Sequence, residues 1–146
     1  MERAALYPGT FDPFTVGHLS IVERGLRLFD RVVVAVGING EKHAATDVEA
    51  RLAAIRSAVG HLSGVEVLAF TGLAVDAAAE CGCGFMLRGV RSVADFDYER
   101  NMAQANRDLS GIESVLLYAL SELGHVSSTL VRDLQRHGRD ASAYLP

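Results

Sequence analysis

Short apolar runs alternate with amphipathic segments along the whole chain. Most of the runs are continuous rather than alternating, which is typical of strands that are covered on both faces of a parallel sheet. They predict strands at residues 4–7, 31–37, 65–70, 85–89 and 113–120. The segments with helical periodicity predict helices at residues 17–29, 48–59, 74–81, 95–109 and 128–137.

Residues that favour helix ends support these boundaries. Thr46 and Glu49 have the spacing of a capping box, in which two side chains satisfy free amides at the start of a helix. Ser127 or Ser128 can cap the last predicted helix. Glycine also follows three of the predicted helices, where a residue with a left-handed backbone is commonly needed. These glycines are Gly60, Gly82 and Gly138.

Five strands, each followed by a helix, predict an α/β fold of Rossmann-like type. The chain fits one domain, residues 1–146, with a five-stranded parallel sheet, helices on both faces and right-handed crossovers. In open parallel sheets, ligands bind beyond the carboxyl ends of the strands. The segments that follow those ends are residues 8–16, 38–46, 71–73, 89–94 and 120–128.

Composition narrows the classes of partner. The formal net charge is -4, so no overall positive field attracts nucleic acid or an acidic membrane. No apolar run approaches the roughly 20 residues of a membrane span, and the N-terminus lacks the apolar region of a secretory signal. Cys81 and Cys83 are too close in sequence to link distant parts of the fold by a disulfide, and two cysteines are too few to complete a zinc site. We therefore expect reduced thiols and a cytoplasmic protein.

The segment after the first predicted strand has residues suited to holding an anion. Gly9 lets the backbone approach a ligand, and Thr10 adds a hydroxyl. Gly17 and His18 open the first predicted helix, whose free amides and positive dipole end favour phosphate and disfavour an imidazolium. Neither the GxGxxG nor the GxxxxGK phosphate loop occurs. The spacing alone leaves a plain turn before a capped helix as an equal alternative.

Cations at two neighbouring strand ends favour the anion site over the plain turn. Lys42 follows the second predicted strand, and Arg88 and Arg91 lie at the end of the fourth. Each by itself is typical of a solvated surface residue, but together they would lie at one edge of an acidic protein. A guanidinium clamps phosphate through two hydrogen bonds, whereas lysine acts as a point charge. The sequence "GHVSSTL", residues 124–130, adds hydroxyls and amides at another helix start. These segments together predict a polyphosphate site.

Three motifs carry a resemblance to a known family. "GTFDPFTVGH", residues 9–18, resembles the nucleotidylyltransferase signature, with T-x-G-H at residues 15–18. "RGVRSVADFDYE", residues 88–99, and "VSSTLVR", residues 126–132, narrow the resemblance to the phosphopantetheine adenylyltransferases. The resemblance covers nearly the whole chain. It implies reversible transfer of AMP from ATP to 4'-phosphopantetheine, which gives dephospho-coenzyme A and pyrophosphate in coenzyme A synthesis. It also implies Mg2+, a homohexamer and coenzyme A as a feedback inhibitor.

The resemblance also implies roles for individual residues. His18 would contact the α-phosphate and stabilise the transition state, with Lys42 and Arg91 as further catalytic residues. The implied ATP contacts are Thr10, Phe11, His18, Gly89, Val90, Arg91, Glu99, Gly124, His125, Val126, Ser127, Ser128, Thr129 and Leu130. The implied phosphopantetheine contacts are Thr10, Lys42, Leu73, Ala74, Arg88, Met102 and Asn106. For Leu73 and Met102, packing of a helix against the core is an equal alternative. No metal ligands are assigned, and Mg2+ would be bound mainly through the ATP phosphates.

Other functions remain as alternatives. A small nucleotidylyltransferase could use the same triphosphate site with another acceptor, such as nicotinamide mononucleotide. A flavodoxin-type binding module would not need this set of cations, and an aminoacyl-tRNA synthetase would need more chain than 146 residues. The chain departs from the family at Gly124 and His125, where some relatives have a bulky aromatic residue, and it stops at "AYLP", where many relatives continue into a further helix.

Overall fold

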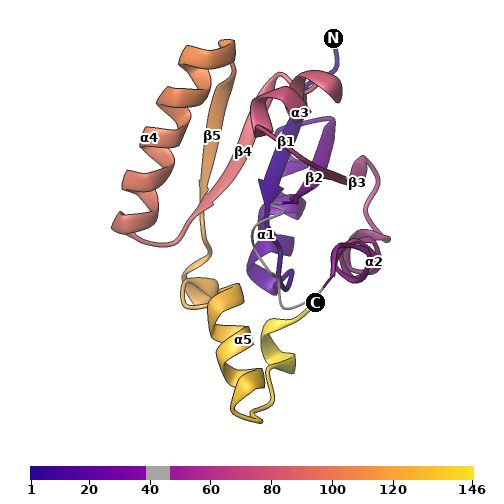
Figure 1. Ribbon diagram of the computed structural model, residues 1–146, viewed down its shortest axis with the longest axis vertical. Helices are drawn as coiled ribbons and strands as arrows, with labels where there is room; N and C mark the ends of the chain where they lie inside the picture. The colour runs from indigo at the N-terminus through magenta and orange to yellow at the C-terminus, as the bar shows by residue number, and fades with distance from the viewer. Residues whose placement is uncertain (39–46) are drawn as a thin grey trace.

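The computed structural model describes residues 1–38 and 47–146. Strands and helices alternate along the chain, as the apolar pattern predicts (Figure 1). The strands are β1 (Ala4–Gly9), β2 (Arg31–Gly37), β3 (Val65–Phe70), β4 (Phe85–Val90) and β5 (Glu113–Tyr118). The helices are α1 (Val16–Gly25), α2 (Val48–Val59), α3 (Ala74–Glu80), α4 (Val93–Ser110) and α5 (Ser128–Arg136), with short 3-10 helices η1 (Ser121–Leu123) and η2 (Ser142–Tyr144). The bounds of β2, α2 and β3 are those predicted from the sequence, and the others differ by a few residues at one or both ends.

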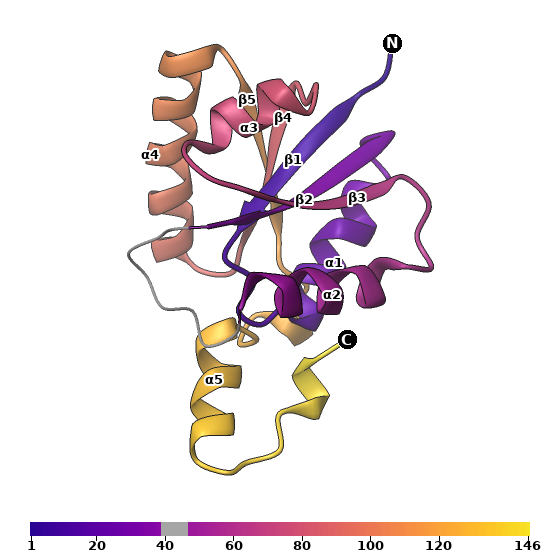
Figure 2. The same cartoon turned by 45° about the vertical axis from the view of Figure 1, so that its right-hand side comes forward.

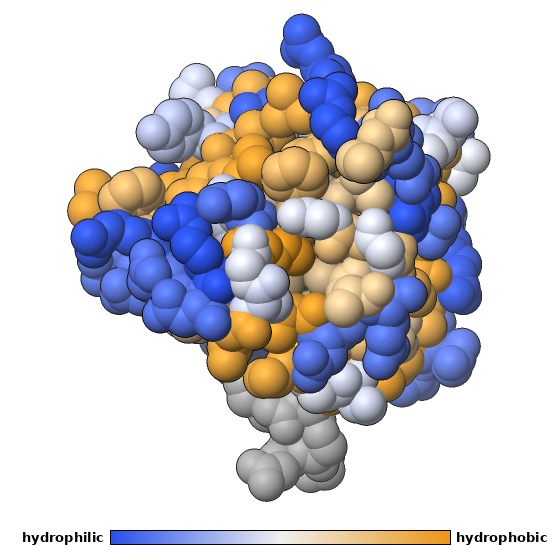
Figure 3. All heavy atoms as spheres, turned by 90° about the horizontal axis from the view of Figure 1, so that it is seen from above, coloured by the Kyte–Doolittle hydropathy of each residue, from blue (hydrophilic) through white to orange (hydrophobic). Residues whose placement is uncertain are grey.

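The five strands form one parallel sheet in the order β3-β2-β1-β4-β5. Two buried clusters cover its faces. One cluster joins the sheet to α1 and α2 through residues such as Ile21 and Ile55, and the other joins it to α3 through Val75 and Ala78. The predicted parallel sheet with helices on both faces is therefore confirmed. Seen from above, apolar residues lie across the middle of the molecule and polar residues gather at its sides (Figure 3).

The strand order reverses at β1, which lies between β2 and β4. β1 pairs with β2 over its whole length, up to Gly9, but it pairs with β4 only at Ala5 and Leu6. Beyond Leu6 the two central strands therefore share no further ladder pairs. α5 lies beyond the carboxyl end of β1, away from the sheet (Figures 1 and 2). Ligands of doubly wound folds bind at such a reversal, so the fold points to the ends of β1 and β4.

Of the two predicted helix caps, the one at α2 is wrong and the one at α5 is confirmed. α2 is capped by Asp47, whose carboxylate accepts a hydrogen bond from the amide of Ala50 at 2.8 Å. The predicted capping box of Thr46 and Glu49 is therefore wrong, because the extended residue before the helix is Asp47, and Thr46 itself lies outside the described residues. Ser127 caps α5 by accepting from the amide of Leu130 at 3.0 Å, as predicted.

The glycines after the helices differ in the sign of their backbone φ angle. Gly82 and Gly138 have φ of 68° and 71°, so the predicted left-handed residues are confirmed there. Gly60 has φ of -59° and is right-handed, so the prediction is wrong there, and the turn after α2 is closed by the amide of Leu62, which donates to the carbonyl of Val59 at 2.8 Å. The left-handed end of α4 is Gly111, with φ of 76°. Among the described residues, no helix is both long enough and apolar enough to cross a membrane.

Candidate active site

A first cavity of about 320 Å³ opens at the carboxyl ends of β1 and β4. It is lined by the segment between β1 and α1, the end of β4 and the start of α5. Most of the predicted ATP contacts lie on its wall: Thr10, Phe11, His18, Gly89, Val90, Arg91, Val126, Ser127, Ser128 and Thr129. Gly124, His125, Leu130 and Glu99 are not on this wall. Three segments that are distant in sequence thus meet around one space.

His18 is held by the first turn of its own helix. Thr15 is the N-cap residue of α1 and His18 occupies the third helical position, so the two form a capping box. The backbone N–H of Thr15 donates to Nδ1 of His18 at 2.9 Å, and the amide of His18 donates to the Thr15 hydroxyl at 3.4 Å. Because Nδ1 accepts, the neutral ring carries its proton on Nε2. His18 is therefore a fixed hydrogen-bond donor in the cavity wall.

Aromatic rings enclose the imidazole. Phe14 stacks on it with ring centroids 5.4 Å apart, and Phe11 meets it edge-on at 5.0 Å. Burial, followed by the positive charges of Arg88 and Arg91, lowers the pKa of His18 to about 4. The ring is therefore neutral near pH 7.

A second cavity of about 310 Å³ lies between α3, α4 and the ends of the central strands. Every predicted phosphopantetheine contact within the described residues lines it: Thr10, Leu73, Ala74, Arg88, Met102 and Asn106. The remaining one, Lys42, lies outside the described residues. Leu73 and Met102 keep 55% and 41% of their surface exposed. Packing into the core, the alternative for these two residues, is therefore not what the structure contains.

The two cavities share one stretch of backbone and one side chain. Pro8, Gly9, Thr10 and Arg88 line both. The first cavity is the more polar, because His18 and Arg91 line it, whereas Leu73 and Met102 line the second. The site therefore has room for two ligands that meet at the end of β1.

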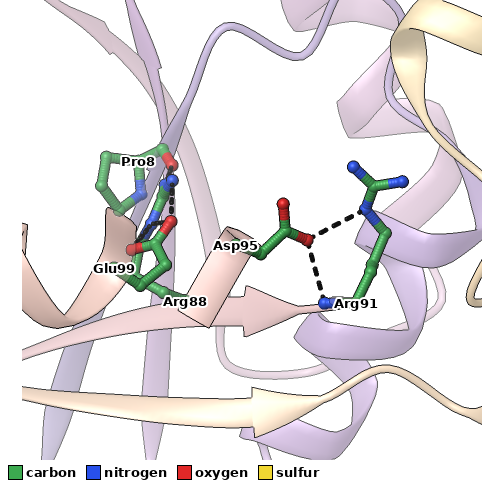
Figure 4. Close-up of polar contacts among 5 residues, drawn as sticks. All are labelled: Pro8, Arg88, Arg91, Asp95 and Glu99. Atoms are coloured by element: carbon green, nitrogen blue, oxygen red, sulfur yellow. Dashed lines mark hydrogen bonds and ion pairs between the residues drawn. The ribbon is translucent and has the colours of Figure 1, made fainter. Parts of the chain in front are cut away.

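Two arginines at the end of β4 are paired with acids from α4 (Figure 4). Arg88 binds the Glu99 carboxylate through Nε, at 2.9 and 3.0 Å, and through Nη2 at 2.8 Å. Its Nη1 donates to the carbonyl of Pro8. Arg91 binds Asp95 from Nε at 3.4 Å and is more exposed than Arg88. Glu99, expected on the ATP side, thus lies at the second cavity beneath Arg88.

The segment between β1 and α1 is held through its carbonyl groups. Arg51 of α2 donates to the carbonyl of Thr10 at 2.8 Å. From α5, Arg132 donates to the carbonyl of Asp12 at 2.6 Å and Ser128 donates to the carbonyl of Pro13 at 2.7 Å. Carbonyl oxygens repel a phosphate, so occupying them with donors favours an anion in the adjacent cavity.

Several residues of the site were not singled out from the sequence. Thr15 and Arg132 lie inside the quoted motifs, so the motifs were a signal for both. Arg51 had no such signal, because a charged residue in an amphipathic helix is normally solvated, yet it is only 7% exposed. Tyr7 lines the first cavity beside Phe11, and its burial raises the pKa of its hydroxyl well above the usual value.

Gly124 and His125 are not on this wall, although Leu123 of η1 and Val126 line it. His125 packs edge-on against the ring of Tyr144, with centroids 5.6 Å apart. Gly124 ends η1 with a right-handed backbone. Among the described residues, no group of three or more His, Cys, Asp or Glu side chains is placed to hold a metal ion. The donors of the first cavity are N–H and hydroxyl groups, which suit the oxygens of a phosphate chain.

Comparison with known proteins agrees with this arrangement. Residues 6–134 match the model of the cytidylyltransferase-like family. The chain is 42% identical over 144 residues to the phosphopantetheine adenylyltransferase of Bacteroides thetaiotaomicron, covering 99% of this chain and 95% of that one. It is 44% identical over 145 residues to that of Porphyromonas gingivalis, with the same coverage of each chain.

Solved structures share the fold at lower identity. A putative nicotinate-nucleotide adenylyltransferase from Vibrio parahaemolyticus superposes with a TM-score of 0.70 at 20% identity, over 99% of this chain and 87% of that one. A bifunctional NMN adenylyltransferase/ADP ribose pyrophosphatase from Francisella tularensis superposes with a TM-score of 0.72 at 14% identity, over 99% of this chain and 45% of that one. These likenesses concern the fold alone. The identity over nearly the full length shows that the chain belongs to the phosphopantetheine adenylyltransferase family, within the cytidylyltransferase-like proteins.

Proposed function

We propose that this protein transfers AMP from ATP to 4'-phosphopantetheine, giving dephospho-coenzyme A and pyrophosphate, in coenzyme A synthesis. The observation that carries the proposal is the pair of cavities that meet at Pro8, Gly9, Thr10 and Arg88. A polar cavity with a neutral histidine and an arginine suits the triphosphate. A mostly apolar cavity that reaches the same junction suits a flexible acceptor arm that ends in a phosphate.

The reaction needs positioning more than acid/base chemistry. An oxygen of the acceptor phosphate attacks the α-phosphorus of ATP, and the bond to the oxygen that leaves with pyrophosphate breaks. The attacking group is already an anion near neutral pH, so no general base is required. The barrier comes from bringing two anions together, and fixed donors lower it.

His18 is the donor for the reacting phosphate in this proposal. Its Nε2 carries the proton because Nδ1 accepts from Thr15, and a neutral donor does not have to be deprotonated or reoriented during the reaction. Arg91 meets the phosphates of ATP, which its exposed guanidinium can reach while Nε stays on Asp95. Thr10 and Lys42 hold the acceptor phosphate.

The acceptor is 4'-phosphopantetheine rather than a pyridine nucleotide. The second cavity is lined by apolar residues such as Phe70, Leu73 and Met102, with Asn106 as an amide partner. Such a wall suits an alkyl chain interrupted by amides. A pyridine mononucleotide would bring ribose hydroxyls against Phe70, Leu73 and Met102, whose apolar side chains cannot pair with them.

A pyrophosphate-release assay with ATP tests this assignment. One arm contains 4'-phosphopantetheine and the other contains nicotinamide mononucleotide, each with Mg2+. We expect pyrophosphate only with phosphopantetheine, and dephospho-coenzyme A as the second product. Release only with the pyridine nucleotide would overturn the assignment.

Mg2+ enters this proposal bound to the phosphates of ATP. The described wall of the first cavity supplies N–H and hydroxyl donors around the phosphates, and this set fits a metal held by the nucleotide rather than by a protein cluster. When bound, Mg2+ neutralises charge on the phosphate chain. His18, Arg91 and the start of α5 then orient the nucleotide.

We also propose a homohexamer in the cytoplasm that is inhibited by coenzyme A. Large apolar side chains remain exposed on α4 and on the edge strand β5, among them Val93, Phe96 and Tyr118, and such residues commonly lie in contacts between subunits. Both cysteines are free, which suits a reducing compartment. Coenzyme A contains the phosphopantetheine arm and so fits the second cavity. Light scattering during gel filtration measures the assembly.

A further inference from the structure

We propose that Glu99 is a positioning residue, which acts on the reaction by holding the Arg88 guanidinium between the two substrate cavities. This inference rests on the proposed function and differs from the nucleotide contact that family resemblance implies for Glu99. Three observations carry it: the separation of β1 from β4, the geometry of the ion pair and the place of Glu99 in the second cavity.

The separation of the central strands gives Arg88 its place. β1 and β4 pair only at Ala5 and Leu6, whereas β1 pairs with β2 as far as Gly9. Beyond Leu6 the carbonyl of Pro8 has no partner from β4 backbone, and Nη1 of Arg88 donates to it instead. The side chain of Arg88 thus bridges the two strands where the ladder stops.

Glu99 determines how that side chain lies. The carboxylate accepts hydrogen bonds from Nε and Nη2 of Arg88 in a bidentate contact, with distances of 2.8 to 3.0 Å. Only 8% of the Glu99 side chain is exposed. Of the five N–H groups of the guanidinium, three are thereby directed to Glu99 and Pro8. The two others, one on each Nη, have no partner among the described residues. They remain for a ligand at the junction of the cavities.

The neighbouring ion pair of Arg91 and Asp95 is held less tightly than that of Arg88 and Glu99. Arg91 and Asp95 come from the same strand end and the same helix as Arg88 and Glu99 (Figure 4). Their contact is longer, at 3.4 Å, and the Arg91 side chain is 41% exposed against 30% for Arg88. Arg91 can adjust to a ligand, whereas Arg88 is fixed before a ligand arrives. A fixed guanidinium between two anionic substrates sets the approach of one to the other.

The position of Glu99 disfavours a direct contact with ATP. Glu99 lines the second cavity and not the first, and both of its carboxylate oxygens accept from Arg88. A second-cavity carboxylate at this place would also repel an acceptor phosphate if Arg88 did not neutralise it. Its effect on the reaction therefore passes through Arg88.

A double-mutant cycle tests the proposal with Glu99→Gln, Arg88→Met and the two combined. Glu99→Gln keeps the size of the side chain but removes its charge and one accepting oxygen. We expect kcat to fall about 10-fold to 100-fold, as for one lost charge-assisted hydrogen bond, while KM for ATP stays within about twofold. In the Arg88→Met background the same change should not lower kcat, because there is no guanidinium left to hold, and it should lower KM for phosphopantetheine if it changes it at all, because an unpaired carboxylate is removed.

Opposite results overturn the proposal. A nucleotide contact made by Glu99 itself would raise KM for ATP, and by the same factor in both backgrounds. Direct titration with ATP gives the fraction of folded, binding-competent protein, and kcat is normalised to it, so a loss of folding is not read as a loss of positioning. A loss of kcat that disappears after this normalisation assigns Glu99 a structural role only.

Two further variants complete the experiment. Glu99→Asp keeps the charge but is one methylene shorter, so it should retain part of the kcat that Glu99→Gln loses; a loss as large as that of Glu99→Gln would contradict the role of the ion pair. Asp108→Asn is the matched control on the same helix, an exposed acid bonded to Gln104 at 2.9 Å, and should match the wild type. If the wild type itself gives no pyrophosphate with phosphopantetheine, the proposed function fails instead.

Discussion

The backbone N–H of Thr15 lies 2.9 Å from Nδ1 of His18, and this contact joins the start of a helix to the chemistry of the site. The residue that completes the cap of α1 is also the donor proposed for the reacting phosphate. One hydrogen bond therefore stabilises the helix, selects the Nε2 tautomer and directs the other ring nitrogen away from the backbone.

Replacement of His18 separates these roles. His18→Ala should raise the barrier to turnover by about 2–4 kcal/mol, as when one transition-state donor is lost, with little change in ATP affinity. It should also lower the free energy of unfolding by about 1 kcal/mol, because the cap loses its acceptor. His18→Gln keeps an acceptor at the third helical position, so it should lose turnover but keep more of the stability. Steady-state kinetics and urea unfolding measure the two effects, and near-normal turnover in His18→Ala would refute the assigned role.

The neutral state of His18 also predicts how stability depends on pH. Its pKa is lowered, mainly by burial, from 6.5 to about 4 in the folded protein, so the unfolded chain takes up a proton first as the pH falls. The contribution of His18 is complete above pH 6.5 and is lost between pH 6.5 and 4. Since each pKa unit corresponds to about 1.4 kcal/mol, the loss reaches about 3 kcal/mol.

Urea unfolding at several pH values checks this prediction against His18→Gln. The carboxylates titrate in both proteins, so the difference between the two curves isolates the imidazole. The stability of the wild type should fall more steeply than that of the variant over this window. Parallel curves would mean that His18 titrates in the folded protein as it does in the unfolded chain.

Arg91 should act on ATP. Its guanidinium is exposed at the first cavity, and within the described residues Asp95 holds it at Nε alone. Arg91→Ala should raise KM for ATP about 10-fold to 100-fold, because a charge-assisted contact to phosphate is lost, with a smaller change in KM for phosphopantetheine. Arg100→Ala removes an exposed arginine of α4 and serves as the control. A larger rise in KM for phosphopantetheine than in KM for ATP would contradict the assignment of Arg91 to ATP.

Lys42 should act on the acceptor. It lies outside the described residues, so this expectation comes from the family resemblance and from its place after the second predicted strand. Lys42→Ala should raise KM for phosphopantetheine more than KM for ATP, because it removes a point charge from the acceptor phosphate. Initial rates with each substrate varied in turn measure both constants. An equal effect on both would contradict the division of the two phosphates.

Much of the fold follows from local pattern. The runs "RVVVAVG" and "VEVLAF" are apolar with little interruption, and they form β2 and β3 at the predicted bounds. Parallel strands place their carboxyl ends at one edge, so the order of strands and loops along the chain already predicts that His18, Arg88 and Arg91 lie near one another. All three line the first cavity.

The partners of the charged side chains did not follow from local pattern. Arg88 contacts the carbonyl of Pro8, which is 80 residues away in the sequence, and Arg51 contacts that of Thr10, which is 41 residues away. The family resemblance implied a nucleotide contact for Glu99, whereas in the structure its carboxylate binds Arg88.

Local pattern was enough to predict the alternation of strands and helices, the parallel sheet and the edge at which the polar residues gather. Each of these depends on burial and helix or strand period, which a chain shows residue by residue. The burial of Glu99 against Arg88 and the meeting of two cavities at Pro8, Gly9 and Thr10 became visible in the folded chain alone. Those relations depend on where β1 and β4 separate and on how α4 packs over them, and segments distant in sequence set both.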